Sequence, residues 1–196
     1  GVADAETQKG LGAVFADSVK RITRLTTQMQ FLSREGLQRL DDVSVVPLLE
    51  DAFQDAIAKL PKHKASLVVK NENEGLTVAG EEAGLKQVFA EILLNSLQAS
   101  SKDQRIEVHC RAIDRDDSPW VEVEVLDQGP GFDADQRLRA TDPFYSGRSV
   151  GLGLGLAVAK RLIELHGGIL DLGDEKRGVR VILPRKAVIR PTAASS

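Results

Sequence analysis

The chain has 196 residues, of which 42% are hydrophobic and 4% aromatic, and its formal net charge at pH 7 is -3. This length suits one domain with an appendage, and the apolar content is enough for an aliphatic core. The acidic balance excludes a broad basic surface for nucleic acid, and no stretch approaches the roughly 20 apolar residues that cross a bilayer.

Cysteine usage indicates a reducing compartment. The single cysteine, Cys110, excludes an internal disulfide, and its alternating, strand-like surroundings predict a packed thiol. No signal peptide opens the chain. We therefore expect a soluble, cytoplasmic fragment without membrane contact of its own. The sequence leaves open whether a longer parent is tethered to a membrane.

One long helix is predicted near the N-terminus. Residues 1–10 are small and polar and are interpreted as a frayed start, after which helical spacing runs from Val14 to Leu40. The apolar residues recur at steps of three and four: Phe15, Val19, Ile22, Leu25, Met29 and Leu32. Between Ile22 and Leu32 the spacing matches a coiled-coil seam. So narrow a stripe needs a partner. It either packs back on its own domain or joins a helical bundle, which we favour.

The remaining chain predicts an α+β domain. After a break at residues 41–44, helices are expected at Val45–Leu60, Glu81–Ser100 and Gly153–His166. Strands are expected at Ala65–Val69, Leu76–Val78, Arg105–Ile113, Val121–Leu126, Ile169–Leu172 and Val179–Leu183, the first two paired around a polar turn. Residues 133–150 predict a mobile loop. The fold class is a two-layer α/β sandwich, a mixed sheet covered by helices on one face. The expected domains are 1–41, 42–187 and a disordered tail, 188–196.

The first segment with chemical content is Asp127-Gln128-Gly129-Pro130-Gly131, at the end of a predicted strand. A carboxylate there can accept a hydrogen bond from an exocyclic adenine amine, and glycines let a flat ring approach the backbone. The alternative is an ordinary Asp-Gly turn.

The second segment, Gly151-Leu152-Gly153-Leu154-Gly155-Leu156, precedes a helix. Backbone N–H groups at a helix start attract anions, and glycines admit phosphate oxygens. The spacing fits neither a Rossmann fingerprint nor a P-loop. The alternative is a flexible, glycine-rich hinge.

The third segment places Glu91 and Asn95 four residues apart, on one face of an otherwise apolar helix. A carboxylate and an amide oxygen together suit a magnesium ion that keeps several waters. The alternative is a solvated stripe on the helix.

Together these segments resemble the ATP-binding domain of bacterial sensor histidine kinases, in the superfamily of gyrase, Hsp90 and MutL. The resemblance covers about residues 43–186 and implies the Bergerat-type ATP-binding fold. The matching motifs are the N box (residues 91–100), the G1 box (127–131), the F box (142–145), the G2 box (151–156) and Leu165-His166-Gly167-Gly168. The helix Val14–Leu40 resembles the second helix of that family's dimerisation and phosphoacceptor hairpin.

The resemblance implies roles for individual residues. Asp127 would bind the adenine amine, with Gly129 and Gly131 lining the base. Asn95 would ligate Mg²⁺, and Glu91 would be a catalytic base or a second metal ligand. The remaining nucleotide contacts would come from Gln98, Ala99, Phe144, Gly151, Leu152, Gly153, Leu154, Gly155 and Leu156. Phe144 would also anchor an ATP lid at residues 133–150.

Several positions depart from the family pattern. Glu91 stands where sensor kinases commonly carry Asn, and its spacing to Asn95 is that of the superfamily's ATPases. Gln98 and Leu152 replace a basic residue and a Thr or Ser, and no Ser or Thr near Gly178 supports the adenine site. The phosphoacceptor motif His-Glu-x-x-Arg/Asn-x-Pro-Leu is missing. The chain's three histidines, His63, His109 and His166, are expected to be structural or surface residues.

The predicted function is the ATP-binding catalytic domain of a two-component sensor histidine kinase. Its ATP γ-phosphoryl group would go to a histidine absent from this sequence, and then to a response-regulator receiver domain. The full-length parent would form a homodimer, with ATP and Mg²⁺ as ligands. Two alternatives stay open: an ATP hydrolase or switch that uses Glu91, and a non-catalytic scaffold that dimerises through its N-terminal helix.

Overall fold

The computed structural model describes residues 2–146, 152–173 and 178–185, without the side chains of residues 2–10, 13 and 17. By its internal contacts the chain divides into two compact units, residues 1–34 and 35–196. The first unit consists of one long helix, α1 (Val2–Leu32). The second is an α/β domain.

Helix α1 is longer at its start and shorter at its end than predicted. The expected frayed start is helical from Val2, because Ala, Glu, Gln and Lys in residues 3–9 are strong helix formers. The helix ends at Leu32 instead of Leu40, and the Ser33 hydroxyl bonds the Gln30 carbonyl there at 3.1 Å. Within the apolar stripe Phe15 is 72% and Ile22 63% exposed, whereas Leu25 and Leu32 are half-buried.

The second unit has four described helices and seven described strands. The helices are α2 (Val45–Ile57), α3 (Glu82–Ala99), α4 (Ala134–Arg139) and α5 (Gly155–Leu165). The strands are β1 (Asp41–Ser44), β2 (Ser66–Asn71), β3 (Thr77–Gly80), β4 (Arg105–Arg115), β5 (Ser118–Leu126), β6 (Ile169–Asp171) and β7 (Val179–Pro184). Most of these elements lie within a few residues of their predicted bounds.

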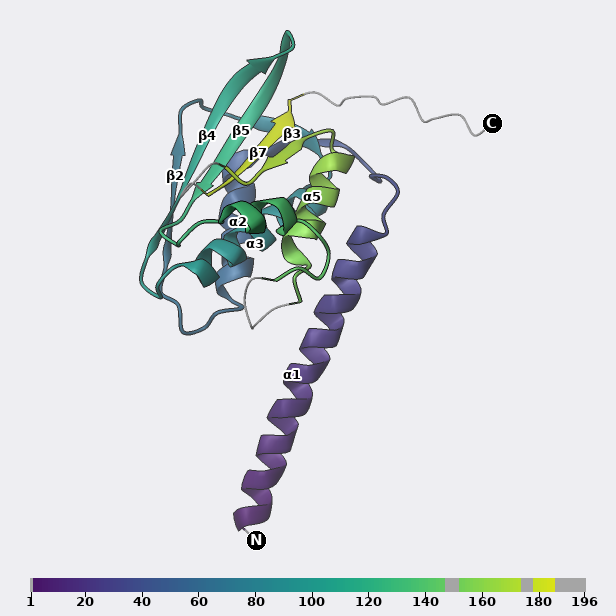
Figure 1. Cartoon of the computed structure of the whole chain (residues 1–196), viewed down its shortest axis with the longest axis vertical. Coiled ribbons are helices and arrows are strands. Elements are labelled where there is room, and N and C mark those ends of the chain that lie inside the picture. The colour runs from purple at the N-terminus through teal and green to yellow at the C-terminus, as the bar shows by residue number, and fades with distance from the viewer. Residues whose placement is uncertain (1, 147–151, 174–177, 186–196) are drawn as a thin grey trace, which may run out of the picture. The chain divides into compact units, whose positions relative to one another are not determined.

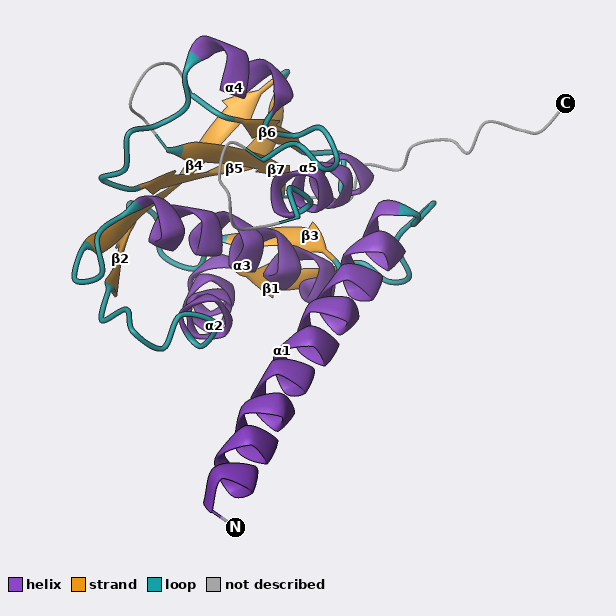
Figure 2. Ribbon diagram, turned by 60° about the horizontal axis from the view of Figure 1, so that its bottom comes forward, coloured by secondary structure: helices purple, strands orange, loops and turns teal. Residues whose placement is uncertain are grey.

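The strands form two sheets (Figure 1). The larger has the order β2-β4-β5-β7-β6, in which only β2 and β4 run parallel. The smaller is the antiparallel pair β1-β3. Helices α2, α3 and α5 lie along one face of the larger sheet (Figure 2). The predicted mixed sheet with helices on one face is therefore confirmed.

The core lies between that face and the helices. Alternate residues of each central strand point inward, so that Val108 and Cys110 of β4 and Val123 and Val125 of β5 are fully buried. Helix α3 is buried nearly all round, since eleven of its eighteen residues are inaccessible. This explains its weak helical periodicity and makes it the central support of the domain.

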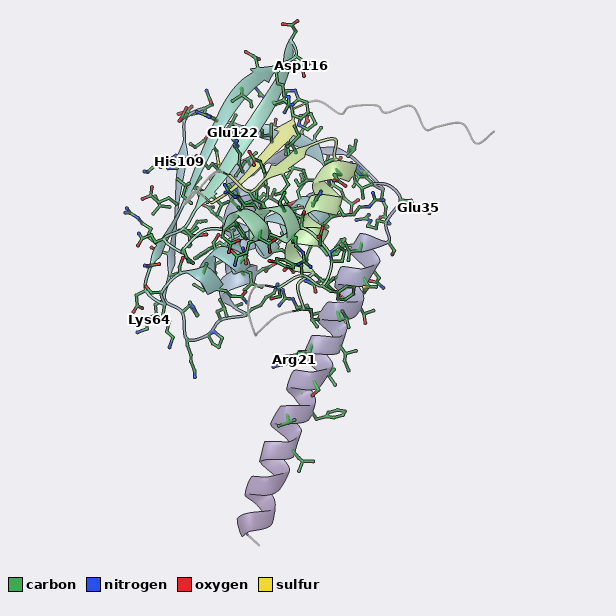
Figure 3. The ribbon with its side chains drawn as sticks, in the orientation of Figure 1. Arg21, Glu35, Lys64, His109, Asp116 and Glu122 are labelled. Carbon is green, nitrogen blue, oxygen red and sulfur yellow. The ribbon has the colours of Figure 1, made fainter. Side chains whose placement is uncertain are left out.

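The opposite face of the sheet carries charged pairs. Glu122 of β5 is only 6% exposed and binds the guanidinium of Arg111 on β4, with 2.6 Å between its Oε1 and Nη2. Arg180 of β7 lies 3.8 Å from the other Glu122 oxygen and also pairs with Asp171 of β6. Figure 3 labels Glu122 on β5, with His109 on the neighbouring strand. These pairs make a polar outer face across four strands.

Two predictions about the first half of the domain are wrong. Residues 41–44, predicted as a break, form strand β1. Their sequence has a weak strand pattern, with Val43 as the one buried apolar residue, but backbone pairing with β3 makes the segment a strand. The predicted pair of strands around residues 71–75 does not form. Strand β2 pairs in parallel with β4, and β3 pairs with β1. Local spacing favoured a hairpin, whereas the tertiary fold separates the two strands.

Two predicted loops are more regular than expected. Within residues 133–150, helix α4 begins at a capping box in which Asp133 and Gln136 exchange side-chain to backbone bonds of 2.8 and 3.1 Å. The strands predicted at Arg105–Ile113 and Val121–Leu126 imply a polar loop at Asp114–Pro119, which is a tight hairpin turn in the structure. Asp116 and Asp117 both have positive φ, 52° and 55°, as a type I′ turn requires. Asp116 marks the tip of this hairpin in Figure 3. The rest of the lid, residues 147–150, lies outside the described residues, as does the tail beyond 185.

Candidate functional site

Helix α3 carries four of the predicted site residues over two turns of its second half. Glu91 is only 3% exposed, Asn95 one turn later is half-buried, Gln98 is exposed, and Ala99 is half-buried. Of these four residues, the first is a buried carboxylate, and the three nearer the C-terminus of the helix have amide or small side chains. The predicted solvated stripe does not describe Glu91, which is buried.

The Glu91 carboxylate is held from two sides. Gln87, one turn earlier on α3, donates a hydrogen bond of 2.9 Å to its Oε1. On the other side lies Gly155, the first residue of α5: a Cβ built on this glycine would lie 2.6 Å from Oε2 of Glu91. A carboxylate beside a helix start is favourably placed in the field of the helix. Sequence reasoning missed Gln87, although its spacing of four residues to Glu91 was a usable signal.

The G1 segment closes onto the end of α3. The backbone N–H of Gly129 donates to Oδ1 of Asp127 at 2.8 Å, which fixes the carboxylate at the end of β5. A Cβ on Gly129 would lie 2.8 Å from the Ala99 Cβ and 3.1 Å from the Ala99 carbonyl oxygen. Gly131 has φ 72°, a conformation that favours glycine. The structure therefore brings Ala99, Asp127 and Gly129 together.

The F-box and G2 segments are joined through their backbones. The N–H of Phe144 donates to the Gly153 carbonyl at 3.0 Å. A Cβ on Gly153, whose φ is 66°, would lie 2.4 Å from the Tyr145 carbonyl oxygen. Phe144 itself has φ 66°, which is unusual for an aromatic residue and marks local strain. Its side chain is 64% exposed, so the F box is held here by backbone contacts.

The leucines of the G2 segment divide into two groups. Leu154 and Leu156 are buried, so they fix the start of α5 in the core. Leu152 is 46% exposed. Because the leucine side chains are apolar, only backbone groups of this segment could contact phosphates, as expected for a helix start. Gly151 lies outside the described residues.

The three histidines have structural surroundings. His166 is buried, accepts a hydrogen bond of 3.0 Å from the Glu81 N–H at Nε2, and contacts the Leu162 carbonyl through Nδ1 at 2.7 Å. This ring links the end of α5 to the start of α3. His109 lies on β4, with its Nε2 3.5 Å from Glu107. His63 follows α2 in a loop. None of them lies on α1.

The packed state predicted for Cys110 is confirmed. The thiol is fully buried, and burial raises its pKa to about 12. A separate cavity of about 600 Å³ lies between α2 and β2, and none of its lining residues belongs to the predicted site. Among the described residues, no helix has the length and apolarity needed to cross a membrane.

The family follows from a comparison of the sequence with family models. Residues 80–187 match the model described as "Histidine kinase-, DNA gyrase B-, and HSP90-like ATPase", which spans more than half of the chain. The chain belongs to this ATPase family. The matched range contains every residue of the predicted nucleotide site, and the resemblance stated from the motifs is confirmed.

Members of the histidine kinase branch are prominent among the relatives. The C4-dicarboxylate transport sensor protein DctB of Rhizobium meliloti is 26% identical over 165 residues, with 83% of this chain and 26% of that protein covered. Sensor histidine kinase ZraS of Klebsiella oxytoca is 27% identical over 169 residues, covering 86% of this chain and 36% of that protein. The chain thus spans about a quarter to a third of these relatives' length.

Solved structures share the fold. Full-length ShkA in complex with AMPPNP superimposes on 88% of this chain and 38% of its own, with a TM-score of 0.69 and 21% sequence identity. The predicted identity as a histidine kinase ATP-binding catalytic domain is confirmed by the family match and the relatives. The alternatives of an ATP hydrolase and a scaffold are not favoured.

Proposed function

We propose that the protein to which this chain belongs transfers the γ-phosphoryl group of ATP to a histidine, and then to an aspartate of a receiver domain. The observation that carries this proposal is that two glycine-containing segments contact α3, the G1 segment at Ala99 and the start of α5 at the buried Glu91, within a family of ATP-binding domains. Because the proposed reaction consumes cellular ATP, we place the domain in the cytoplasm.

Asp127 is proposed to recognise the base. Its Oδ1 is occupied by the Gly129 N–H, so Oδ2 is the atom that we assign to the exocyclic amine of adenine. Gly129 has no room for a side chain between Ala99 and Asp127, so this glycine lets the turn that carries Asp127 pack against the end of α3. Gly131, Ala99 and Gln98 are proposed to border the base and sugar.

The start of α5 is proposed to hold the phosphates. Its free N–H groups and the glycines at 151, 153 and 155 suit anions, and Phe144 ties the lid to this segment through Gly153. With Gln98 in place of a cation, we expect backbone groups to carry more of this binding. Orientation of the phosphates by fixed dipoles is the main contribution that a protein makes to phosphoryl transfer.

Asn95 and Glu91 are proposed as the magnesium side of the site. The two residues lie one helical turn apart, and Gln87 already donates a hydrogen bond to one Glu91 oxygen. The site therefore offers a metal ion few oxygen ligands from the protein. Such a set fits Mg²⁺, which usually keeps waters and phosphate oxygens as its other ligands. When bound, this ion would neutralise charge that develops on the transferred group.

Helix α1 is proposed to pair with a second helix in a dimer of the parent protein. Leu11, Val14, Phe15 and Ile22 are 63–72% exposed and recur at spacings that place them along one side of the helix. A run of exposed large side chains of this kind is typical of a bundle helix without its partner.

The proposal is tested by calorimetric titration of the chain with ATP, with and without Mg²⁺. Asp127→Asn should weaken binding about ten- to hundred-fold, because a charge-assisted hydrogen bond is lost. The matched control is Asp114→Asn on the β4–β5 hairpin, which should bind as the unchanged chain does. Asn95→Ala should remove most of the magnesium dependence. Normal binding by Asp127→Asn, with an intact circular dichroism spectrum, would contradict the site.

The transfer step needs the full-length parent. Incubation with ATP labelled at the γ position should give an acid-labile, base-stable phosphoprotein, as expected for phosphohistidine, and a receiver domain should remove the label. Steady release of phosphate without any phosphoprotein would favour the ATP hydrolase instead.

A further inference from the structure

Strand β2 lies at one edge of the larger sheet, and its hydrogen bonds show which of its backbone groups face outward (Figure 1). The Lys64 N–H, just before the strand, donates to a carbonyl of the loop before β4 at 2.8 Å. The Glu72 N–H, just after the strand, donates to the Cys110 carbonyl of β4 at 3.0 Å. In a parallel pair every second residue of a strand bonds to its neighbour, so the even-numbered residues of β2 bond to β4. The odd-numbered residues turn their N–H and carbonyl groups to the free edge: Leu67, Val69 and Asn71.

The same odd-numbered residues border the cavity of about 600 Å³ between β2 and α2. Alternate side chains of a strand share one face, and those of Leu67, Val69 and Asn71 line this cavity. On the helix side Val46, Glu50 and Phe53 line it, at spacings that place them on one face of α2. The residues with outward backbone groups therefore also border a largely apolar hollow beside the edge.

The edge of β2 lacks the features that usually prevent pairing with another chain. Proline, a charge that points inward, a bulge or a very short strand protects most natural edges. Strand β2 has six residues in unbroken register with β4 and contains no proline. Its charged residue, Lys70, pairs with Glu107 at 2.7 Å on the opposite face of the sheet. The other outer strand of this sheet, β6, has only three residues. Of these two edges, β2 is the one that suits an added strand.

The charge of helix α2 indicates the chemistry of that strand. All three charged residues of α2 are acidic: Glu50, Asp51 and Asp55. Asp55 pairs with Lys86 of α3 at 3.0 Å. Glu50 borders the cavity, is exposed, and has no ion-pair partner among the residues that the structure describes. A second copy paired through its own β2 would place another acidic α2 beside this one. A basic side chain would instead meet an unpaired carboxylate.

We propose that β2 and α2 form a docking site for an extended, basic segment of a partner protein, which adds as a strand beside β2. The odd-numbered residues of β2 supply the backbone hydrogen bonds, and alternate side chains of the segment enter the cavity. Apolar side chains meet Phe53, and a Lys or Arg meets Glu50. None of the cavity residues belongs to the proposed nucleotide site, so this inference does not rest on the proposed function.

The test uses the synthetic peptide acetyl-Thr-Val-Thr-Arg-Thr-Val-Thr-amide, whose Val and Arg side chains share one face of an extended chain. Titrated to about 1 mM into the isotope-labelled full chain, it should shift the NMR amide signals of residues 66–71 and of α2. The matched peptide with Glu in place of Arg should bind about ten-fold more weakly, because its carboxylate meets Glu50. Shifts confined to other residues, no shift at all, or equal binding of the two peptides overturns the inference.

Charge variants test the role of Glu50. Glu50→Lys should reverse the preference, so that the Glu peptide binds more tightly than the Arg peptide. The matched control is Glu164→Lys on α5, also an exposed helical glutamate, which should keep the preference of the unchanged chain. If the preference survives in Glu50→Lys, with an intact circular dichroism spectrum, this carboxylate does not select the segment and the inference fails.

Two proline variants test the assigned alternation. Val69→Pro removes an N–H that faces the free edge, so the chain should fold by circular dichroism and lose peptide binding. Val69→Ala keeps that N–H and should retain binding. Val68→Pro removes an N–H that bonds to β4 and should lower the melting temperature far more than Val69→Pro does. Equal destabilisation by the two prolines contradicts the alternation. Self-association of the full chain that Val69→Pro abolishes would identify a second copy as the occupant and overturn the inference.

Discussion

The carboxylate of Glu91 lies against Gly155, so that a Cβ on the glycine would be 2.6 Å from Oε2. The contact joins the middle of α3 to the first residue of α5, two helices that carry different parts of the proposed nucleotide site. Because Glu91 is 3% exposed and its other oxygen is bound by Gln87, the carboxylate has little freedom to move away. The separation of the two helices at this point is therefore set by a glycine.

Gly155→Ala should consequently destabilise the domain by about 1–3 kcal/mol, the usual cost of overpacking a closed site. Urea unfolding measures this loss, and ATP affinity should fall with it. In a double-mutant cycle, Glu91→Ala should relieve part of the cost, since it removes the atom that the new methyl group meets. Additive effects of the two substitutions would contradict the contact.

The matched control for that experiment is Gly12→Ala in α1. Apart from its own helix backbone and chain neighbours, no described atom lies within 4 Å of a Cβ at Gly12, and the residue is in the interior of a helix. Alanine should be neutral or should raise helix stability by up to about 1 kcal/mol. The opposite signs at the two glycines separate a steric effect from helix propensity.

Gly178 gives a harsher prediction. A Cβ there would lie 1.5 Å from the carbonyl oxygen of Val125, and this oxygen belongs to the central strand β5. Backbone cannot yield as a side chain does, so Gly178→Ala should cost about 3 kcal/mol or more, at the upper end of overpacking effects. Thermal unfolding with Gly36→Ala as the control, where nothing lies within 4 Å, measures the difference. A normal melting temperature for Gly178→Ala would contradict the close approach of Gly178 to the Val125 carbonyl oxygen.

His166→Leu should destabilise the domain without touching the proposed nucleotide contacts. The leucine fills much of the ring's volume but leaves the part-buried Glu81 N–H without this acceptor, at a cost of about 1–3 kcal/mol. A side chain larger than histidine does not fit at position 166, because the ring already lies close to Gly80. A Cβ built on Gly80 would be 2.9 Å from it. Chemical denaturation gives the loss, and hydrogen exchange should show the Glu81 amide losing protection. An unchanged exchange rate there would contradict the assigned bond.

Cys110 should resist thiol reagents while the domain is folded. Burial raises its pKa from 9.0 to about 12, so the reactive thiolate is scarce at pH 8 and is also inaccessible. Labelling by a disulfide reagent should appear only with unfolding in urea. The sign of the pH effect follows: above pH 9 the unfolded thiol ionises and the folded one does not, so stability falls as pH rises toward 12. Cys110→Ala should remove this part of the alkaline loss.

The sequence predicted the local structure of the motif segments, because each depends on local chemistry. Asp127 and the glycines that follow it predict a turn at a strand end, and the spacing of Glu91 and Asn95 places both on one face of a helix. What the sequence could not supply was the pairing between distant segments. Strand β2 has the same alternation whether it pairs with β3 in a hairpin or with β4 in parallel, and long-range packing decides between them.

Contacts within the site were also beyond the sequence. Nothing in the residues around Gly155 indicates that Glu91 will be its neighbour. By contrast, the helix at 134–139 could have been found, since Asp133 and Gln136 form a capping box whose signature is visible in the sequence. The lack of any buried residue in that helix left it without an apolar pattern.

The order of the strands in the larger sheet also affects how the chain folds during its synthesis. Strand β7 lies between β5 and β6 although it is the last of the described strands in sequence, and its residues 179–184 pair along the edge of β5 that β4 leaves free. A nascent chain on the ribosome therefore carries β5 with one edge open until these residues emerge. An open central strand invites association with other chains. Release from the ribosome shortly before residue 179 should thus yield an aggregation-prone product, even though every proposed nucleotide-binding residue has already been synthesised.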